Sequence, residues 1–135
     1  MDSSDVIACL QRYFATRSDV AAVYLFGSVA RGVDTPKSDV DVGIFFGSFA
    51  RDELQRFEDL EDIRADLETT LRRSVDVIAV DRASPDFLHR MLRDRIVIAD
   101  HDHQARLEFE VKARNDYFDL LPILERYRAS VLERL

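Results

Sequence analysis

The spacing of apolar residues along this chain alternates between helical and strand-like periods. Apolar positions three or four apart predict a first helix that Ser3 or Ser4 caps and that extends to Phe14. Further helical spacing covers residues 50–71, 85–92 and 104–135. Continuous or alternating apolar runs, typical of strands, cover residues 20–26, 39–46, 75–80 and 96–99. Helices that alternate with strands indicate one α/β domain over residues 1–135.

The same pattern predicts which faces are buried. Residues 39–46 place Asp39 and Asp41 on one face of their strand and only apolar residues on the other. The helix over 50–71 carries an apolar stripe that is expected to pack in the core. Its members are Leu54, Phe57, Leu60, Ile63, Leu67 and Leu71. The C-terminal helices, residues 104–135 with a break or kink at Pro122, are apolar over much of their circumference. One stripe should pack on the sheet, and the rest is extra core or a partner surface.

Composition narrows the class of protein. The 135 residues are 47% hydrophobic, which fits a folded domain and disfavours disorder. Acidic residues outnumber basic ones by 26 to 19, and the resulting net charge of −7 disfavours direct binding to nucleic acid. A single cysteine excludes an intrachain disulfide and a multi-cysteine zinc site. With no apolar run near the length of a membrane span and no signal peptide, we expect a cytoplasmic protein.

The chemically informative part of the sequence is a Gly-Ser pair after a buried strand, followed by two aspartates. Gly27 ends the strand, where glycine permits a sharp turn and the close approach of a ligand. Ser28 would open a short helix, whose free amides and hydroxyl can bind a phosphate. Asp39 and Asp41 would project from one face of the next strand and repel unless a cation such as Mg²⁺ lies between them. The combination predicts a site for a nucleoside triphosphate and magnesium.

The full motif reads GSVARG over residues 27–32 and SDVD over residues 38–41. It resembles the signature of the nucleotidyltransferase fold shared with the DNA polymerase β palm. It is most similar to the minimal nucleotidyltransferase (MNT) antitoxins of HEPN–MNT toxin–antitoxin pairs. The resemblance implies an α/β (α+β) fold, in which a short mixed sheet is flanked by helices and followed by a C-terminal helical segment. Only residues 25–46 are highly specific, and the rest of the chain fits loosely in length and strand order.

The resemblance also implies a third carboxylate on a neighbouring strand, and Asp76 fits that position. Its parity along the strand separates it from Val75 and Val77, so Asp76 should share a face with Ile78 and Val80. If that face also carries the Asp-x-Asp pair, three carboxylates converge.

Phosphoryl-transfer chemistry assigns roles to these residues. The expected catalytic and metal-binding residues are Asp39, Asp41 and Asp76, which would hold two Mg²⁺ ions. The expected phosphate-binding residues are Gly27, Ser28 and Arg31. Asp76 would also receive the proton of the attacking hydroxyl. An alternative stays open for Arg31, which could instead form a surface ion pair.

The resemblance implies an antitoxin that transfers AMP from ATP to a tyrosine of a cognate HEPN ribonuclease toxin and thereby silences it. Two alternatives stay open, a binding-only antitoxin and an aminoglycoside-type enzyme that modifies a small molecule. Retention of all three acids favours the enzyme, because a pure binder has no need to cluster like charges. The expected partners are the toxin and ATP with Mg²⁺, without a membrane. Whichever of Tyr117 and Tyr127 is exposed is expected to contact the toxin.

Other features have simpler interpretations. His101 and His103 lack a third ligand at a telling spacing and are expected in a polar turn. Arg95 and His101 have the R-x5-H spacing of the HEPN ribonuclease motif, but that motif lies on a helix, whereas residues 96–99 predict a strand. Cys9 is expected to be a small core residue.

Overall fold

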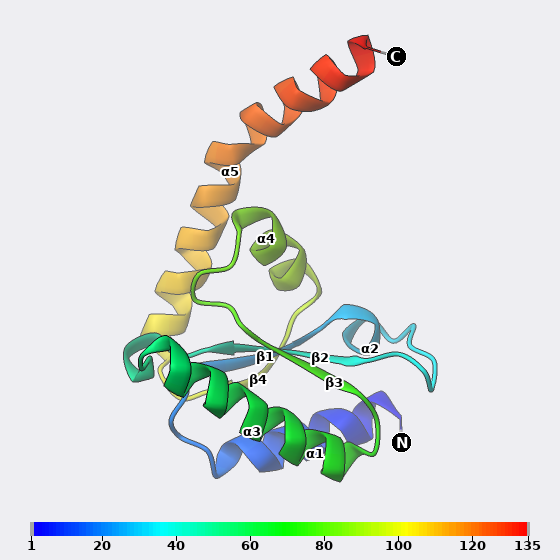
Figure 1. Cartoon of the computed structure of the whole chain (residues 1–135), viewed down its shortest axis with the longest axis vertical. Helices are drawn as coiled ribbons and strands as arrows, with labels where there is room; N and C mark the ends of the chain where they lie inside the picture. Colours follow the sequence, from blue (N-terminus) through cyan, green and yellow to red (C-terminus); the bar gives the residue numbers. More distant parts are fainter. Residues whose placement is uncertain (1, 135) are drawn as a thin grey trace.

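The computed structural model describes residues 2–134 and contains one four-stranded mixed sheet with the order β3-β2-β1-β4 (Figure 1). The strands are β1 (Ala22–Phe26), β2 (Val40–Phe45), β3 (Val75–Ala79) and β4 (Ile96–Asp100). The helices are α1 (Ser3–Ala15), α2 (Gly27–Arg31), η1 (Gly47–Phe49), α3 (Glu53–Leu71), α4 (Pro85–Asp94) and α5 (His103–Glu133). Strand β1 is antiparallel to β2 and β4, whereas β2 and β3 are parallel and connected through α3. The predicted fold, a short mixed sheet flanked by helices, is confirmed.

Helices cover both faces of the sheet. Figure 1 shows α1 and α3 on one side, and α4 with the first part of α5 on the other. Alternate side chains of β1 supply the two cores: Val23 and Leu25 pack with α1 and α3, whereas Ala22 and Tyr24 pack with α4 and α5. Because every residue of a strand points to the face opposite its neighbour, burial on both sides explains the continuous apolar run that predicted β1.

A polar network attaches α5 to the sheet. The hydroxyl of Tyr24 donates a hydrogen bond of 3.0 Å to Glu110, and Arg106 donates one of 2.6 Å to the same carboxylate. Arg106 also lies 3.1 Å from a carboxylate oxygen of Asp100 at the end of β4. These contacts fix the first two turns of α5.

The rest of α5 extends beyond the body of the molecule (Figure 1). Of the predicted break or kink at Pro122, the break into two helices is wrong, because α5 is one helix that passes through Pro122 and bends in its orange part. Pro122 is exposed, so water can bind the carbonyl group that a proline leaves unpaired. Within residues 2–134, no helix combines the length and the apolar character needed to cross a membrane.

Two local predictions need correction. Helix α1 is capped by Asp2, whose carboxylate accepts a hydrogen bond from the amide of Asp5, while Asp5 accepts one from the amide of Asp2. Ser3 instead donates to the carbonyl of Val29 and so connects α1 with α2. The second correction concerns α3, whose first turns leave Leu54 exposed.

Only the C-terminal half of the predicted α3 stripe is buried. Ile63, Leu67 and Leu71 lie in the core, whereas the side chains of Leu54 and Phe57 are 70% and 62% exposed. The spacing of apolar residues indicates which face of a helix is apolar, but it does not show how far the sheet extends beneath that face.

Candidate active site

Gly27 and Asp41 lie directly against each other at the junction of β1 and α2. The antiparallel register pairs Phe26 with Asp41, which brings the end of β1 beside the start of β2. Gly27 has a φ of 75°, and a Cβ atom at this position would lie 2.1 Å from Oδ2 of Asp41. Glycine is therefore required twice, for its left-handed backbone and for the space that the carboxylate occupies.

The three predicted acids, Asp39, Asp41 and Asp76, lie close enough to interact electrostatically. In the parallel register Asp41 is paired with Asp76, and Asp39 immediately precedes β2. The pKa of Asp41 is raised above its ordinary value, first by burial and then by the negative charges of Asp76 and Asp39. The positive charge of Arg31 opposes this shift. The structure thus brings these four predicted residues into one neighbourhood.

The predicted orientation of Asp76 is confirmed. Val75 and Val77 pack in the core beside α1 and α3, whereas Val80 packs on the opposite face beside α4. Asp76 shares the parity of Val80, and its side chain is exposed on the same face as Asp41.

The donor set fits a hard divalent cation in its chemistry. Asp39, Asp41 and Asp76 offer carboxylate oxygens, the ligands that Mg²⁺ prefers. Burial is the largest cause of the raised pKa of Asp41, and repulsion from Asp76 and Asp39 adds to it; a bound cation would offset that repulsion. Among residues 2–134, no group of three aspartate, glutamate, histidine or cysteine side chains is placed so that it could coordinate a metal ion as it stands.

Arg31 forms an ion pair that the sequence pattern left open. Its guanidinium donates a hydrogen bond of 3.0 Å to Asp94 on α4, and its side chain is 48% exposed. The pKa of Asp94 is lowered, first by its hydrogen bond with Arg93 and further by Arg31. Asp94 carried no signal in the sequence, because its contact with Arg31 spans 63 residues and depends on the packing of α2 against α4.

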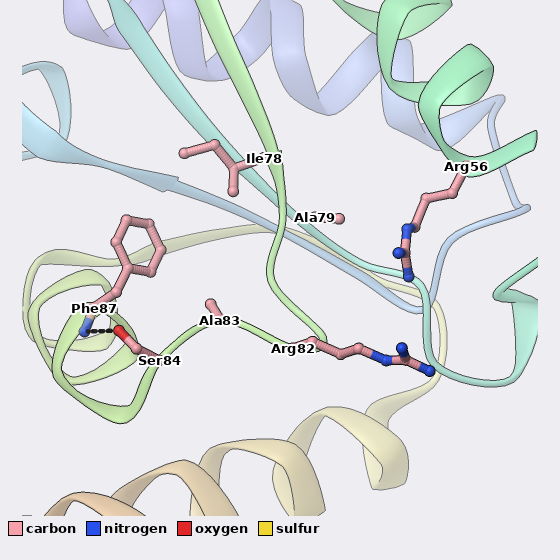
Figure 2. Close-up of a pocket in the computed structure, with 7 residues that line it drawn as sticks. All are labelled: Arg56, Ile78, Ala79, Arg82, Ala83, Ser84 and Phe87. Carbon is pink, nitrogen blue, oxygen red and sulfur yellow. Dashed lines mark hydrogen bonds between the residues drawn. The ribbon is translucent and has the colours of Figure 1, made fainter. Parts of the chain in front are cut away.

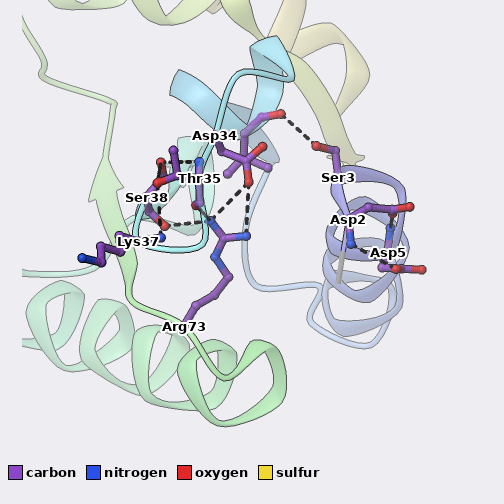
Figure 3. Close-up of polar contacts among 9 residues, drawn as sticks. Asp2, Ser3, Asp5, Asp34, Thr35, Lys37, Ser38 and Arg73 are labelled. Carbon is purple, nitrogen blue, oxygen red and sulfur yellow. Dashed lines mark hydrogen bonds and ion pairs between the residues drawn. The ribbon is translucent and has the colours of Figure 1, made fainter.

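Another arginine that sequence reasoning missed holds the loop before β2 (Figure 3). Arg73 donates hydrogen bonds of 2.8 Å to the carbonyl of Ser38 and 3.2 Å to that of Thr35. It also contacts the carboxylate of Asp34 at 3.3 Å. Because Ser38 directly precedes Asp39, Arg73 fixes the segment from which the acidic strand begins. Arg73 lies between α3 and β3 and belongs to no sequence motif, so nothing in the sequence singles it out.

Ser28 is the second residue of α2 and is partly exposed. Its carbonyl accepts a hydrogen bond from Val33, which helps to close the turn after Gly32. Its hydroxyl makes no hydrogen bond within residues 2–134 and is available to a ligand.

The histidines and the cysteine have structural surroundings. A ring nitrogen of His101 lies 2.8 Å from the carbonyl of Phe14, and one of His103 lies 2.7 Å from Asp100. Residues 96–100 form β4, which agrees with rejecting the ribonuclease motif. Cys9 packs against the core beside α1 and α3, as predicted.

Known structures share this fold. A chain of a toxin–antitoxin crystal structure with AMP-PNP has a TM-score of 0.71 and 21% identity, covering 98% of this chain and 99% of that one. A chain of the toxin–antitoxin MntA–HepT has a TM-score of 0.65 and 20% identity, covering 96% and 97%. A chain of the tri-AMPylated Shewanella oneidensis HEPN toxin in complex with MNT antitoxin has a TM-score of 0.68 and 18% identity, covering 93% and 98%.

No curated protein matches the chain. The sequence model described as "Polymerase beta, Nucleotidyltransferase" matches residues 9–104, which include the Gly-Ser turn and the three acids. The match covers more than half of the chain, and the neighbouring structures have the same architecture. The chain therefore belongs to the polymerase β nucleotidyltransferase family.

Proposed function

We propose that this protein is an MNT-type antitoxin that transfers AMP from ATP to a tyrosine of a cognate HEPN toxin. The observation that carries the proposal is the position of Asp41, which lies opposite Asp76 in the register of β2 and β3 and directly against Gly27, in a nucleotidyltransferase chain. Further support comes from structural neighbours in toxin–antitoxin complexes, one of which is AMPylated and another of which holds an ATP analogue.

The acids and the Gly-Ser turn would divide the work of the transfer. Asp39, Asp41 and Asp76 would hold Mg²⁺, which supplies neutralisation of the triphosphate charge. Gly27 and Ser28 would bind the outer phosphates through the backbone amides and the Ser28 hydroxyl. These contacts would orient the α-phosphorus for in-line attack.

The bond changes follow from that arrangement. The tyrosine oxygen bonds to the α-phosphorus, the bond to the bridging oxygen of the β-phosphate breaks, and pyrophosphate leaves. Asp76, exposed on β3, would accept the proton of the attacking hydroxyl. Arg31 would contact the departing phosphates while Asp94 limits its rotamers.

The outer part of α5 is the candidate surface for the toxin. Its exposed apolar side chains include Phe118, Ile123, Tyr127, Val131 and Leu132. The ring of Tyr117 stacks on His89 with centroids 3.7 Å apart, whereas Tyr127 is 68% exposed. By the expectation stated above, Tyr127 is the aromatic residue that contacts the toxin. This exposed apolar surface also favours the second candidate function, neutralisation by binding alone.

Co-expression separates the two candidate functions. A candidate HEPN toxin is purified after co-expression with wild type or with the Asp41→Asn variant, and its intact mass is measured. We expect adenylate increments only with the wild type. If wild type and variant form the complex equally and the toxin shows no mass increment even with the wild type, binding alone is the function and the enzymatic proposal is contradicted.

A further inference from the structure

A cavity of about 400 Å³ lies between α3, β3 and the loop that leads into α4 (Figure 2). Its walls have two characters. The guanidinium groups of Arg56 and Arg82 lie on one side, and the side chains of Ile78 and Phe87 lie on the other, with Ala83 between them. Such a cavity suits a ligand that combines an anionic group with an apolar part.

Arg56 differs from the other partly buried arginines of the chain. Those arginines are Arg17, Arg56, Arg64, Arg73 and Arg106. All except Arg56 have a carboxylate oxygen within 4.0 Å, whereas Arg56 has none among residues 2–134. Arg82, across the same cavity, also lacks an acidic partner in the described part of the chain. Arg82 is exposed, so partial burial sets Arg56 alone apart. Both guanidinium groups nevertheless line one cavity on a protein of net charge −7, which points to an anionic ligand.

The cavity borders the side of the site that is away from the Gly-Ser turn. Ile78 follows Asp76 by two positions on the same face of β3, a separation of about 7 Å along the strand. Strand β3 is one of the two outer strands of the sheet, whereas Gly27 directly follows the inner strand β1. A molecule bound in the cavity therefore reaches Asp76 from the side opposite the proposed phosphate contacts.

The surroundings of the cavity favour a polypeptide as its occupant. Leu54 and Phe57, which lie on the same turns of α3 as Arg56, are 70% and 62% exposed. Neither side chain lines the cavity, but exposed apolar side chains on the helix that forms one of its walls are typical of a surface that another protein covers. Guanidinium groups bind carboxylates through two parallel hydrogen bonds, so an acidic side chain fits the charged wall.

We propose that this cavity binds an acidic side chain of the acceptor protein and so presents the acceptor hydroxyl to Asp76. The inference rests on the proposed function and adds to it a second contact with the acceptor, separate from α5. Arg56 and Arg82 bind the carboxylate, and the apolar wall formed by Ile78 and Phe87 takes the neighbouring side chain.

The test uses this chain with the same candidate HEPN toxin. The variant is Arg56→Ala with Arg82→Ala, and the matched control is Arg51→Ala, an exposed arginine that does not line the cavity. Kinetics give KM for the HEPN protein and for ATP, and surface plasmon resonance gives Kd for the complex. We expect KM and Kd for the HEPN protein to rise about tenfold, with KM for ATP changed less than about twofold. The control should match the wild type, and lysine at both positions should restore part of the affinity.

Each other outcome is decisive. A rise in KM for ATP with unchanged HEPN affinity would assign the cavity to the nucleotide, and unchanged values throughout would leave it without a role; both overturn the inference. If the wild type binds the HEPN protein without transferring AMP, the enzymatic proposal fails while the comparison of Kd values still tests the cavity. If the wild type neither binds nor modifies the HEPN protein, both proposals fail. Equal urea midpoints for all variants show that folding is unaffected.

Discussion

Gly27→Ala should damage the candidate site far more than it damages the fold. A Cβ at this position would lie 2.1 Å from Oδ2 of Asp41, whereas ordinary contact begins at 3.4 Å. The carboxylate oxygen must therefore move by about 1.3 Å, the difference between these two distances. A displacement of about 1 Å in catalytic geometry can reduce a rate by roughly 100-fold.

The chain offers a matched control in Gly32. Its φ of 72° is close to the 75° of Gly27, but a Cβ there would meet nothing within 4 Å. Alanine at either position costs about 1–2 kcal/mol of folding free energy through its left-handed backbone. The two variants should thus unfold at similar urea concentrations, because the nearest atom is the end of the flexible Asp41 side chain and Cγ of Asp41, at 3.1 Å from the added Cβ, needs to shift by only a few tenths of an ångström.

Activity should separate the two variants. We expect Gly32→Ala to transfer AMP at close to the wild-type rate and Gly27→Ala to be slower by about 100-fold. Calorimetry with MgATP measures whether binding is lost as well. Equal rates for the two variants would refute the idea that the contact between Gly27 and Asp41 positions the acid.

Three further predictions follow from the charged and aromatic contacts. Asp41→Asn should abolish transfer yet raise the free energy of unfolding at neutral pH. Because folding raises the pKa of Asp41 above its ordinary 3.8, the charged carboxylate destabilises the folded state, and the variant removes that cost. The gain in stability should shrink as the pH falls through the raised pKa and vanish below 3.8. A urea series across pH checks the sign, and a gain that grows toward acid would contradict it. Arg73→Ala should cost about 2 kcal/mol and speed hydrogen exchange in the loop before β2, with lysine restoring only part; unchanged exchange would mean that Arg73 does not hold the loop. Tyr127→Ala should raise Kd for the toxin about thirtyfold without changing ATP affinity, as surface plasmon resonance and calorimetry can show; equal losses of both would argue against a separate interface.

The local patterns of the sequence predicted most of the sheet and the orientation of its acids. Alternation in residues 39–46 and 75–80 separated Asp41 and Asp76 from the apolar faces of their strands, and the register places both acids on one face of the sheet, the face beside α4. The faces could be predicted because nearly every residue on one face of each strand, the face beside α1 and α3, is apolar. The position of Gly27 was also predicted, although its contact with the Asp41 carboxylate was not.

Contacts between distant segments could not be predicted in this way. The ion pair of Arg31 with Asp94 and the hydrogen bonds of Arg73 depend on how α2, α4 and the α3–β3 turn are placed in space. The cap of α1 was missed for a different reason, since aspartate and serine are equally good N-caps and only the reciprocal bonds with Asp5 distinguish Asp2. The continuity of α5 through Pro122 reflects a helix that has no neighbour to impose a turn there.

The parallel register of β2 and β3 couples correct folding to the placement of the acids, because the same strand pairing sets both. Asp41 lies opposite Asp76, and the amide of Val75 is held by Glu68 of α3 at 3.1 Å. A slip of one residue would turn Asp76 into the apolar core beside α1 and α3 and would expose Val75 in its place. A buried carboxylate destabilises such a slipped chain more than mutual repulsion destabilises the correct one. Misassembled copies would therefore unfold, rather than persist as folded proteins whose acids are not brought together.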